Sequence, residues 1–174
     1  MRLRRAKGFA AATALVAIGL FALLGAVAAT TARSNAKAKQ FHEIKEAMIS
    51  QADLIWNQLL LCQTLFPTAD NGSGNGVRLQ YPATPADSAV ASISCPGQSP
   101  AVIWSGDYRA MAPRPLAGFG PWTYVNDATS IRISTTAVNA NVPYYRDLMD
   151  AVASKLGAAQ AVRSGDTLTI TLIN

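Results

Sequence analysis

The side chains capable of acid–base or nucleophilic chemistry are few, and they do not form a catalytic pattern. His42 is the single histidine of the chain, and no serine or cysteine lies near it in a recognisable nucleophile motif. Hydrolases of the Gly-x-Ser-x-Gly type and metalloproteases of the His-Glu-x-x-His type need such spacing, and the sequence contains neither motif. Ser105-Gly106-Asp107 and Ser164-Gly165-Asp166 combine residue types that favour tight turns. We therefore expect no enzyme active site.

The acidic residues favour structural roles over a metal or cofactor site. Asp147 and Asp150 lie near the start of a predicted helix, where negative charge suits the helix dipole. A calcium loop needs more oxygen donors at closer spacing, and a zinc site needs clustered cysteine and histidine. We expect no metal ion and no cofactor.

The chain contains two cysteines, Cys62 and Cys95, and their chemistry depends on the compartment. In an oxidising compartment they can pair. A bridge would close a loop of about 34 residues and contribute roughly 3–4 kcal/mol in the chain-entropy model. It would also hold a β-rich region against the end of a helix. The alternative is a pair of buried free thiols, and we favour the disulfide.

Positive charge is concentrated at the N-terminus. Arg2, Arg4, Arg5 and Lys7 are four of the 15 lysines and arginines, and the remaining basic residues nearly balance the 10 acidic ones. Nucleic-acid binding needs a basic face on the folded domain, so we expect no nucleic-acid partner. Residues 9–32 carry no charge, and about 20 apolar residues in a helix span a bilayer. We expect a transmembrane helix there, with the cationic end in the cytoplasm.

After the apolar segment the sequence becomes amphipathic. No proline precedes Pro67, and proline disfavours helical geometry at Phe66 before it. We therefore predict one continuous helix from Phe9 to about Leu65, whose second half, residues 33–66, needs a soluble partner. Apolar residues at alternating three- and four-residue spacing mark one face of this half: Phe41, Ile44, Met48, Ala52, Ile55, Leu59 and Cys62.

Beyond Pro67 the sequence predicts a small antiparallel sheet and a second helix. The glycine-rich residues 70–76 are interpreted as a connecting loop. The second helix is expected from Tyr144 to Leu156, with Pro143 at its start and Gly157 as its stop. The fold class is α+β, a long helix packed on an antiparallel sheet. The expected strands are Val77–Tyr81, Ala89–Ser94, Ala101–Trp104, Trp122–Val125 and Ser130–Thr136, followed by a terminal hairpin, Ala161–Arg163 and Thr167–Ile173, around a turn at residues 164–166.

The N-terminal sequence MRLRRAKG-FAAATALVAIGLFALLG resembles the class III signal of type IV pilins and type II secretion pseudopilins. The shared features are a short basic leader ending in Gly8, an apolar stretch opening at Phe9, and its continuation as a long amphipathic helix. The resemblance covers roughly Met1 to Phe66. It implies that a membrane-embedded prepilin peptidase cleaves between Gly8 and Phe9, and that Phe9 becomes N-methylated.

One position departs from the family pattern. The family usually has glutamate at the fifth mature position, where this chain has Thr13. In the family that carboxylate meets the N-terminal amine of a neighbouring subunit in the fibre core, where an unpaired charge is costly. Threonine can accept a hydrogen bond from the amine but cannot neutralise it. The resemblance therefore implies a minor pilin that caps or primes the fibre.

The resulting organisation has a leader (residues 1–8), a transmembrane and polymerisation half-helix (9–32), an amphipathic half-helix (33–66) and a periplasmic or extracellular β-rich region (67–174). The last two form one globular domain. The implied partners are other pilin or pseudopilin subunits, the prepilin peptidase, the inner-membrane assembly machinery and the membrane. The chain would be a single-pass inner-membrane protein until it enters a surface fibre.

Two alternatives stay open. The first is an exported soluble protein with a conventional secretory signal, cleaved near Ala26-Val27-Ala28. The second is an uncleaved single-pass membrane accessory protein. The charge-free stretch of residues 9–32 is longer than the apolar region of a conventional signal, about 7–15 residues, so we favour the pilin-like hypothesis.

Overall fold

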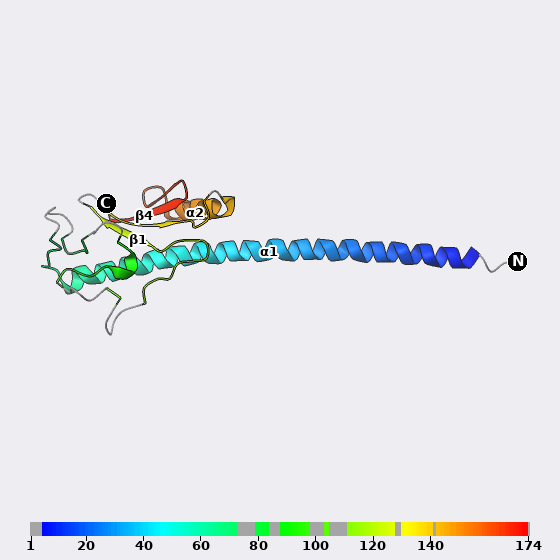
Figure 1. Ribbon diagram of the computed structural model, residues 1–174, viewed down its shortest axis with the longest axis horizontal. Helices are drawn as coiled ribbons and strands as arrows, with labels where there is room; N and C mark the ends of the chain where they lie inside the picture. Colours follow the sequence, from blue (N-terminus) through cyan, green and yellow to red (C-terminus); the bar gives the residue numbers. More distant parts are fainter. Residues whose placement is uncertain are drawn as a thin grey trace. The chain divides into compact units, whose positions relative to one another are not determined.

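The computed structural model describes residues 5–72, 79–83, 88–97, 103–104, 111–127, 130–140 and 142–173; the side chains of residues 5–20 and 24 are outside what it describes. The chain divides into two compact units, Met1–His42 and Glu43–Asn174. The elements, labelled in part in Figure 1, are α1 (Arg5–Leu65), the 3-10 helix η1 (Val90–Ser92), β1 (Thr123–Asn126), β2 (Ile131–Thr136), α2 (Pro143–Leu156), β3 (Ala161–Ser164) and β4 (Thr167–Ile173).

Helix α1 runs without interruption from Arg5 to Leu65, which confirms the predicted continuous helix. It ends where Pro67 restricts the conformation of Phe66, whose amide still donates to the carbonyl of Cys62 at 2.9 Å. Within the folded unit Glu43–Asn174, one face of α1 is completely covered. Its buried apolar residues follow the predicted three- and four-residue spacing: Met48, Ala52, Ile55, Leu59 and Cys62.

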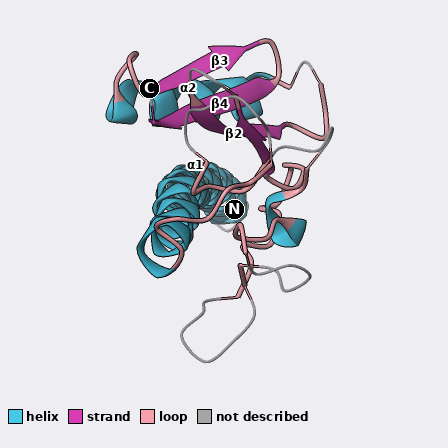
Figure 2. Cartoon of the chain, turned by 90° about the vertical axis from the view of Figure 1, so that its left-hand side faces the viewer, coloured by secondary structure: helices cyan, strands magenta, loops and turns pink. Residues whose placement is uncertain are grey.

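The strands form one antiparallel sheet in the order β1-β2-β4-β3. Because side chains alternate between the faces of a strand, one face carries the buried residues and faces α1. These buried residues are Tyr124, Ile131, Ile133, Leu168 and Ile170. The sheet and α2 lie on the same side of the Glu43–Leu65 part of α1 (Figures 1 and 2). The α+β fold class is thus confirmed.

The opposite face of the sheet is rich in hydroxyl groups. Ser134 and Thr169 lie across β2 and β4 with their hydroxyl oxygens 2.9 Å apart, and Thr136 and Thr167 make the same contact at 2.9 Å. Val162 on β3 is 57% exposed on this face. These residues give β2 and β4 the alternation that made both strands predictable from the sequence.

Helix α2 covers part of the buried face of the sheet. Pro143 occupies the first helical position, and Gly157 ends the helix with φ of 90°, as predicted. Leu148, Met149 and Val152 are fully buried. Three ion pairs connect α2 to neighbouring elements. Lys155 Nζ lies 2.8 Å from a Glu46 carboxylate oxygen of α1. Asp150 Oδ1 lies 2.6 Å from Arg163 Nε of β3, and Arg146 Nε lies 2.9 Å from Asp166 Oδ1 in the turn before β4.

The strand expected over Ala89–Ser94 was wrong. Only Ala89 pairs with β1, opposite Thr123, and residues Val90–Ser92 turn into η1. The cause is local, because both the amide and the hydroxyl of Ser92 donate to the carbonyl of Ala89, each at 3.0 Å. Serine side chains compete with sheet pairing in this way.

Two further expected strands are absent from the residues that the structure describes. Of Val77–Tyr81 it describes residues 79–81, and of Ala101–Trp104 it describes residues 103–104; these are turns and a bend. The carbonyls of Leu79 and Tyr81 accept from the backbone and side chain of Asn71, at 3.0 and 2.9 Å. Both carbonyls therefore accept hydrogen bonds within a loop and not from a neighbouring strand.

Candidate functional site

The residues predicted to be processed lie at the start of α1. Gly8, Phe9 and Thr13 belong to the helical backbone, but their side chains are outside the described residues. The same holds for much of the predicted transmembrane segment, residues 9–32. The predicted cleavage after Gly8 and the role of Thr13 therefore stay predictions.

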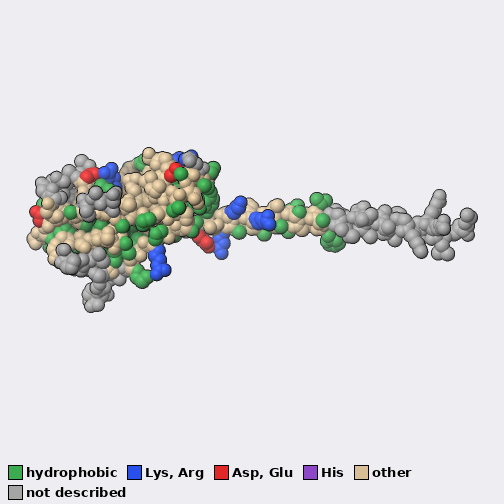
Figure 3. Space-filling model, viewed as in Figure 1, with side chains coloured by type: hydrophobic (Ala, Val, Ile, Leu, Met, Phe, Trp, Pro, Cys, Tyr) green, Lys and Arg blue, Asp and Glu red, His purple; other side chains and the backbone are tan. Residues whose placement is uncertain are grey.

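The described outer part of α1, residues 21–23 and 25–40, is exposed along its whole length. Phe21, Leu23 and Val27 are 76%, 65% and 62% exposed. The hydroxyls of Thr30 and Thr31 both donate to the carbonyl of Val27 at 2.9 Å. Figure 3 shows apolar and then cationic side chains along this part of the helix. In the part of the chain where side chains are described, no helix has a stretch long and apolar enough to cross a membrane.

The two cysteines predicted to pair do form a disulfide. Cys62 near the end of α1 and Cys95 after η1 have Cα atoms 5.3 Å apart, a separation typical of bridged cysteines. Both are buried. The bridge holds the segment Ser88–Gly97 against α1, so the hypothesis of two free thiols does not apply to this structure.

The other residues considered for chemistry are dispersed. His42 is exposed, and residues 105–107 lie outside the described part. Gly165 and Asp166 form the tight turn between β3 and β4, as the Ser-Gly-Asp pattern predicted. Among the described residues, no three histidine, cysteine or acidic side chains come together to hold a metal ion.

The shifted pKa values in the folded unit have structural causes. Burial raises the pKa of the Tyr124 hydroxyl, the nearby Tyr81 adds to this, and the Asn126 side chain opposes it. Tyr124 donates to the carbonyl of Pro82 at 3.1 Å and so acts as a neutral, buried hydrogen-bond donor. Hydrogen bonds from Lys155 and Lys45 lower the pKa of Glu46 on α1.

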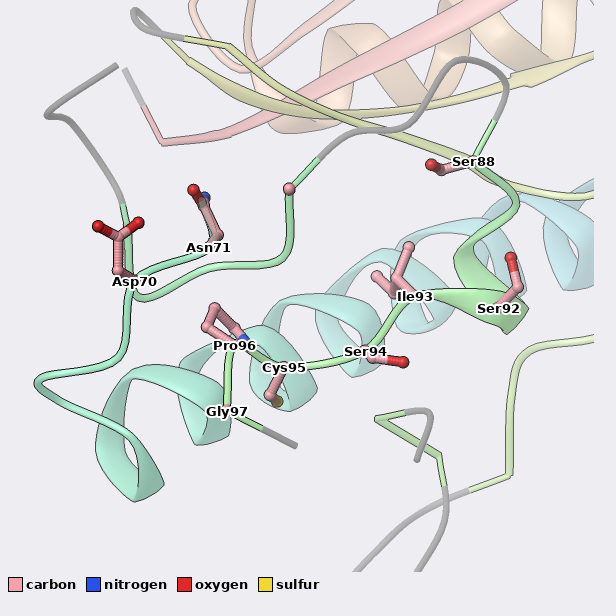
Figure 4. A pocket seen from close by; sticks show the side chains of 10 residues that line it. Asp70, Asn71, Ser88, Ser92, Ile93, Ser94, Cys95, Pro96 and Gly97 are labelled. Carbon is pink, nitrogen blue, oxygen red and sulfur yellow. The ribbon is translucent and has the colours of Figure 1, made fainter. Parts of the chain in front are cut away.

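A cavity of about 400 Å³ lies beside the disulfide. One wall is the loop after α1, which carries Asp70 and Asn71, and the other is the segment Ser88–Gly97 (Figure 4). Polar residues of both walls are among those that line it: Asp70 and Asn71 from the first wall, and Ser88, Ser92 and Ser94 from the second.

The cavity walls are fixed by bonds to the rest of the unit. Asn71 is held by Leu79 and Tyr81, and the Tyr81 hydroxyl donates to Gln63 Oε1 of α1 at 2.9 Å. Ser88 accepts at its carbonyl from the amide of Tyr124, at 2.9 Å. The disulfide ties the opposite end of that wall to α1. These bonds anchor both cavity walls to the folded unit.

Sequence reasoning missed this cavity. The loop with Asp70 was interpreted as a connection, and the serine-rich stretch was interpreted as a strand. In the sequence, the cavity is indicated only by the density of small polar residues in two separate segments, Asp70–Gly76 and Ser88–Ser94. The first segment follows the end of α1, and the second precedes Cys95.

Comparison with known protein families, with curated proteins and with solved structures gives no match for this chain.

Proposed function

We propose that this chain is a structural subunit, a minor pilin or pseudopilin, of a type IV pilus or type II secretion-like fibre. The observation that carries the proposal is α1, a single helix from Arg5 to Leu65. The C-terminal part of α1, from Glu43 to Leu65, contributes buried residues to the core of the folded unit. The described side chains of residues 21–40 are exposed. A subunit that polymerises through one end of a helix and displays a domain at the other needs this arrangement.

The chemistry of the exposed part suits burial among other helices in lipid. Without a hydrophobic driving force, helices in a bilayer associate where small residues allow close approach. Alanine and glycine recur through residues 10–29. The bonds from Thr30 and Thr31 to Val27 satisfy both hydroxyls inside the helix, so neither needs water.

In this proposal the prepilin peptidase cleaves after Gly8 and the new N-terminal Phe9 is methylated. The helix of residues 9–32 then leaves the inner membrane for a fibre, with other subunits and the assembly machinery as partners. The folded unit lies in the periplasm or on the fibre surface, where its disulfide is stable. No catalytic role is proposed.

The test is intact mass and N-terminal sequencing of the protein purified from membranes of its native host. We expect a chain that begins at N-methylated Phe9. A Gly8→Leu variant made in the same host should keep its leader, because the resemblance places cleavage after that glycine. Ala11→Leu, a substitution of similar size beyond the cleavage site, is the matched control and should be processed.

Other starting residues would contradict the proposal. A chain beginning near Ala29 would indicate a conventional secretory signal and a soluble exported protein. An intact Met1 in a host with an active prepilin peptidase would indicate an uncleaved membrane anchor. Processing of Gly8→Leu at the same bond would show that another protease makes the cut.

A further inference from the structure

We propose that residues 33–40 of α1, called the collar below, bind the phosphate headgroups of anionic lipids at the membrane surface. This role rests on the membrane-spanning helix proposed above, but it does not depend on cleavage of the leader or on polymerisation. The collar begins directly after the charge-free residues 9–32. It contains three cations, Arg33, Lys37 and Lys39, and no acidic residue.

The composition of the collar does not suit the core of the folded unit. It contains no apolar side chain larger than alanine, and the apolar stripe of α1 begins after it, at Phe41. All eight side chains of the collar are exposed, whereas Met48 further along the helix is completely buried. Lysine and arginine side chains project from this part of the helix in Figure 3. The collar therefore presents positive charge to partners outside the folded unit.

Two of the three cations are not neutralised within the chain. No aspartate or glutamate lies within four residues of Arg33 or Lys37, so neither can form a helical ion pair at the usual spacing. Among the described residues, neither has an ion-pair partner elsewhere in the fold. Lys39 differs, because Glu43 follows it by four residues. Arg33 and Lys37 are therefore expected to make the main lipid contact.

The spacing along α1 places both cations at the level of the lipid phosphates. At 1.5 Å per residue, the Cα atoms of Arg33 and Lys37 lie about 1.5 and 7.5 Å beyond that of Ala32, the last charge-free residue. The headgroups add about 5–7 Å to each side of the hydrocarbon core. Helical side chains lean towards the N-terminus of their helix, which on this flank is the direction of the bilayer. Both charged groups can therefore reach the phosphates.

Arg33 and Lys37 also share one face of the helix. They are four residues apart, so their Cβ atoms are about 5–6 Å from each other. An arginine can donate two parallel hydrogen bonds to one phosphate, and a lysine adds a compact charge beside it. This pair therefore suits a phosphodiester headgroup and its neighbour.

Position favours lipid over other polyanions as the partner. The headgroup layer surrounds the end of every membrane-spanning helix, and an anionic surface attracts cations within about one Debye length. In the proposed orientation the collar lies on the translocated side, where the positive-inside rule disfavours lysine and arginine. Topology therefore does not account for these cations, whereas headgroup binding does. It would fix the depth of the helix in the bilayer until the subunit leaves for the fibre.

The experiment measures the lipid selectivity of the full chain in vesicles of phosphatidylcholine and phosphatidylglycerol. A dye is attached through Ala32→Cys, because the native cysteines are both in the bridge and do not react. Lipids with a nitroxide near the top of the acyl chain quench the dye on contact. Quenching by each labelled lipid gives their relative association constant. We expect phosphatidylglycerol to be preferred about fivefold or more, since each cation contributes a factor of about five, and the preference should shrink in high salt.

Paired variants assign the preference to the collar. Arg33→Gln combined with Lys37→Gln should bring the relative association constant close to one. Arg33→Lys combined with Lys37→Arg keeps both charges and should keep the preference. Arg114→Gln combined with Lys155→Gln is the matched control, because it removes the same charge from exposed side chains of the folded unit. This control should retain the preference, and near-UV circular dichroism verifies that each variant is folded.

Equal association of the two lipids with the parent chain would overturn the proposal. So would a preference that persists in the double glutamine variant of the collar, or one that is lost in the control. Flotation of the vesicles after an alkaline wash shows separately whether the chain is inserted. A chain that does not float contradicts the membrane-spanning helix itself, whereas a chain that floats without lipid preference contradicts the role of the collar alone.

Discussion

Breaking the Cys62–Cys95 bridge should lower the free energy of unfolding of the folded unit by about 4 kcal/mol. The sequence separation of the two cysteines is 33, and a loop of about 34 residues carries a closure entropy of roughly 12–13 cal/mol/K in the chain-entropy model. Reduction of the native chain isolates this term, because both thiols stay in place. Replacing both cysteines with alanine should cost somewhat more, since the two sulfur atoms are buried and their removal leaves a cavity.

The assay is urea unfolding followed by tryptophan fluorescence, with the oxidised chain, the reduced chain and the double alanine variant compared side by side. For a slope of about 2 kcal/mol per molar urea, the midpoint should fall by about 2 M on reduction. The double alanine variant controls for the reductant and should not respond to it. A midpoint that moves by less than about 0.5 M on reduction would refute the reasoning, because the bridge would then constrain little of the unfolded chain.

Burial raises the pKa of Tyr124, so above pH about 10 the unfolded chain loses a proton that the folded chain keeps. Unfolding should therefore become easier as pH rises beyond 10, and urea midpoints for Tyr124→Phe should show a flatter alkaline decline. Gly118 has φ of +86°, and a Cβ there would overlap the Tyr145 ring. Thermal melts should show Gly118→Ala destabilised by about 1–3 kcal/mol, and Gly25→Ala, with open space around its Cβ, neutral or slightly stabilised. If the fibre proposal holds, Thr13→Glu should enter sheared fibres in larger amounts than the parent chain on immunoblots, because the carboxylate neutralises a buried amine; equal amounts would exclude a role for this position.

The helices were predictable because their signals are local. The face of α1 is marked by spacing alone, and its end is fixed by Pro67. Helix α2 has proline at its first position and Gly157 beyond its last. The hairpin of β3 and β4 combines strict alternation with a turn at Gly165, whose φ is +60°. In each case short-range sterics and side-chain periodicity decide the structure.

The region between Pro67 and Trp122 was not predictable in the same way. In residues 89–94 the side chains alternate in a way that is typical of a strand. The hydroxyl of Ser92 nevertheless donates to the carbonyl of Ala89, and the segment forms the 3-10 helix η1. Strand order in the sheet depends on partners far apart in the chain, which no local pattern encodes. The cavity is a product of the same long-range contacts: the disulfide holds one wall against α1, and the bonds of Asn71 to Leu79 and Tyr81 hold the other.

The proposed orientation in the membrane depends on the disulfide more than on the charge bias. The positive-inside rule counts lysine and arginine close to both ends of a span, and acidic residues contribute little to it. Both flanks of residues 9–32 carry basic residues in equal number: Arg2, Arg4, Arg5 and Lys7 before the span, and Arg33, Lys37, Lys39 and Lys45 after it.

The equal counts mean that the positive-inside rule alone does not fix the orientation predicted from the basic leader. A disulfide, in contrast, persists on the oxidising side. The Cys62–Cys95 bridge lies wholly within the folded unit, and its two residues are buried. If the protein from native membranes contains free thiols at both positions after denaturation, the argument for a periplasmic domain is lost. Labelling the denatured protein with a maleimide, before and after reduction, thus tests the proposed orientation as directly as it tests the bridge.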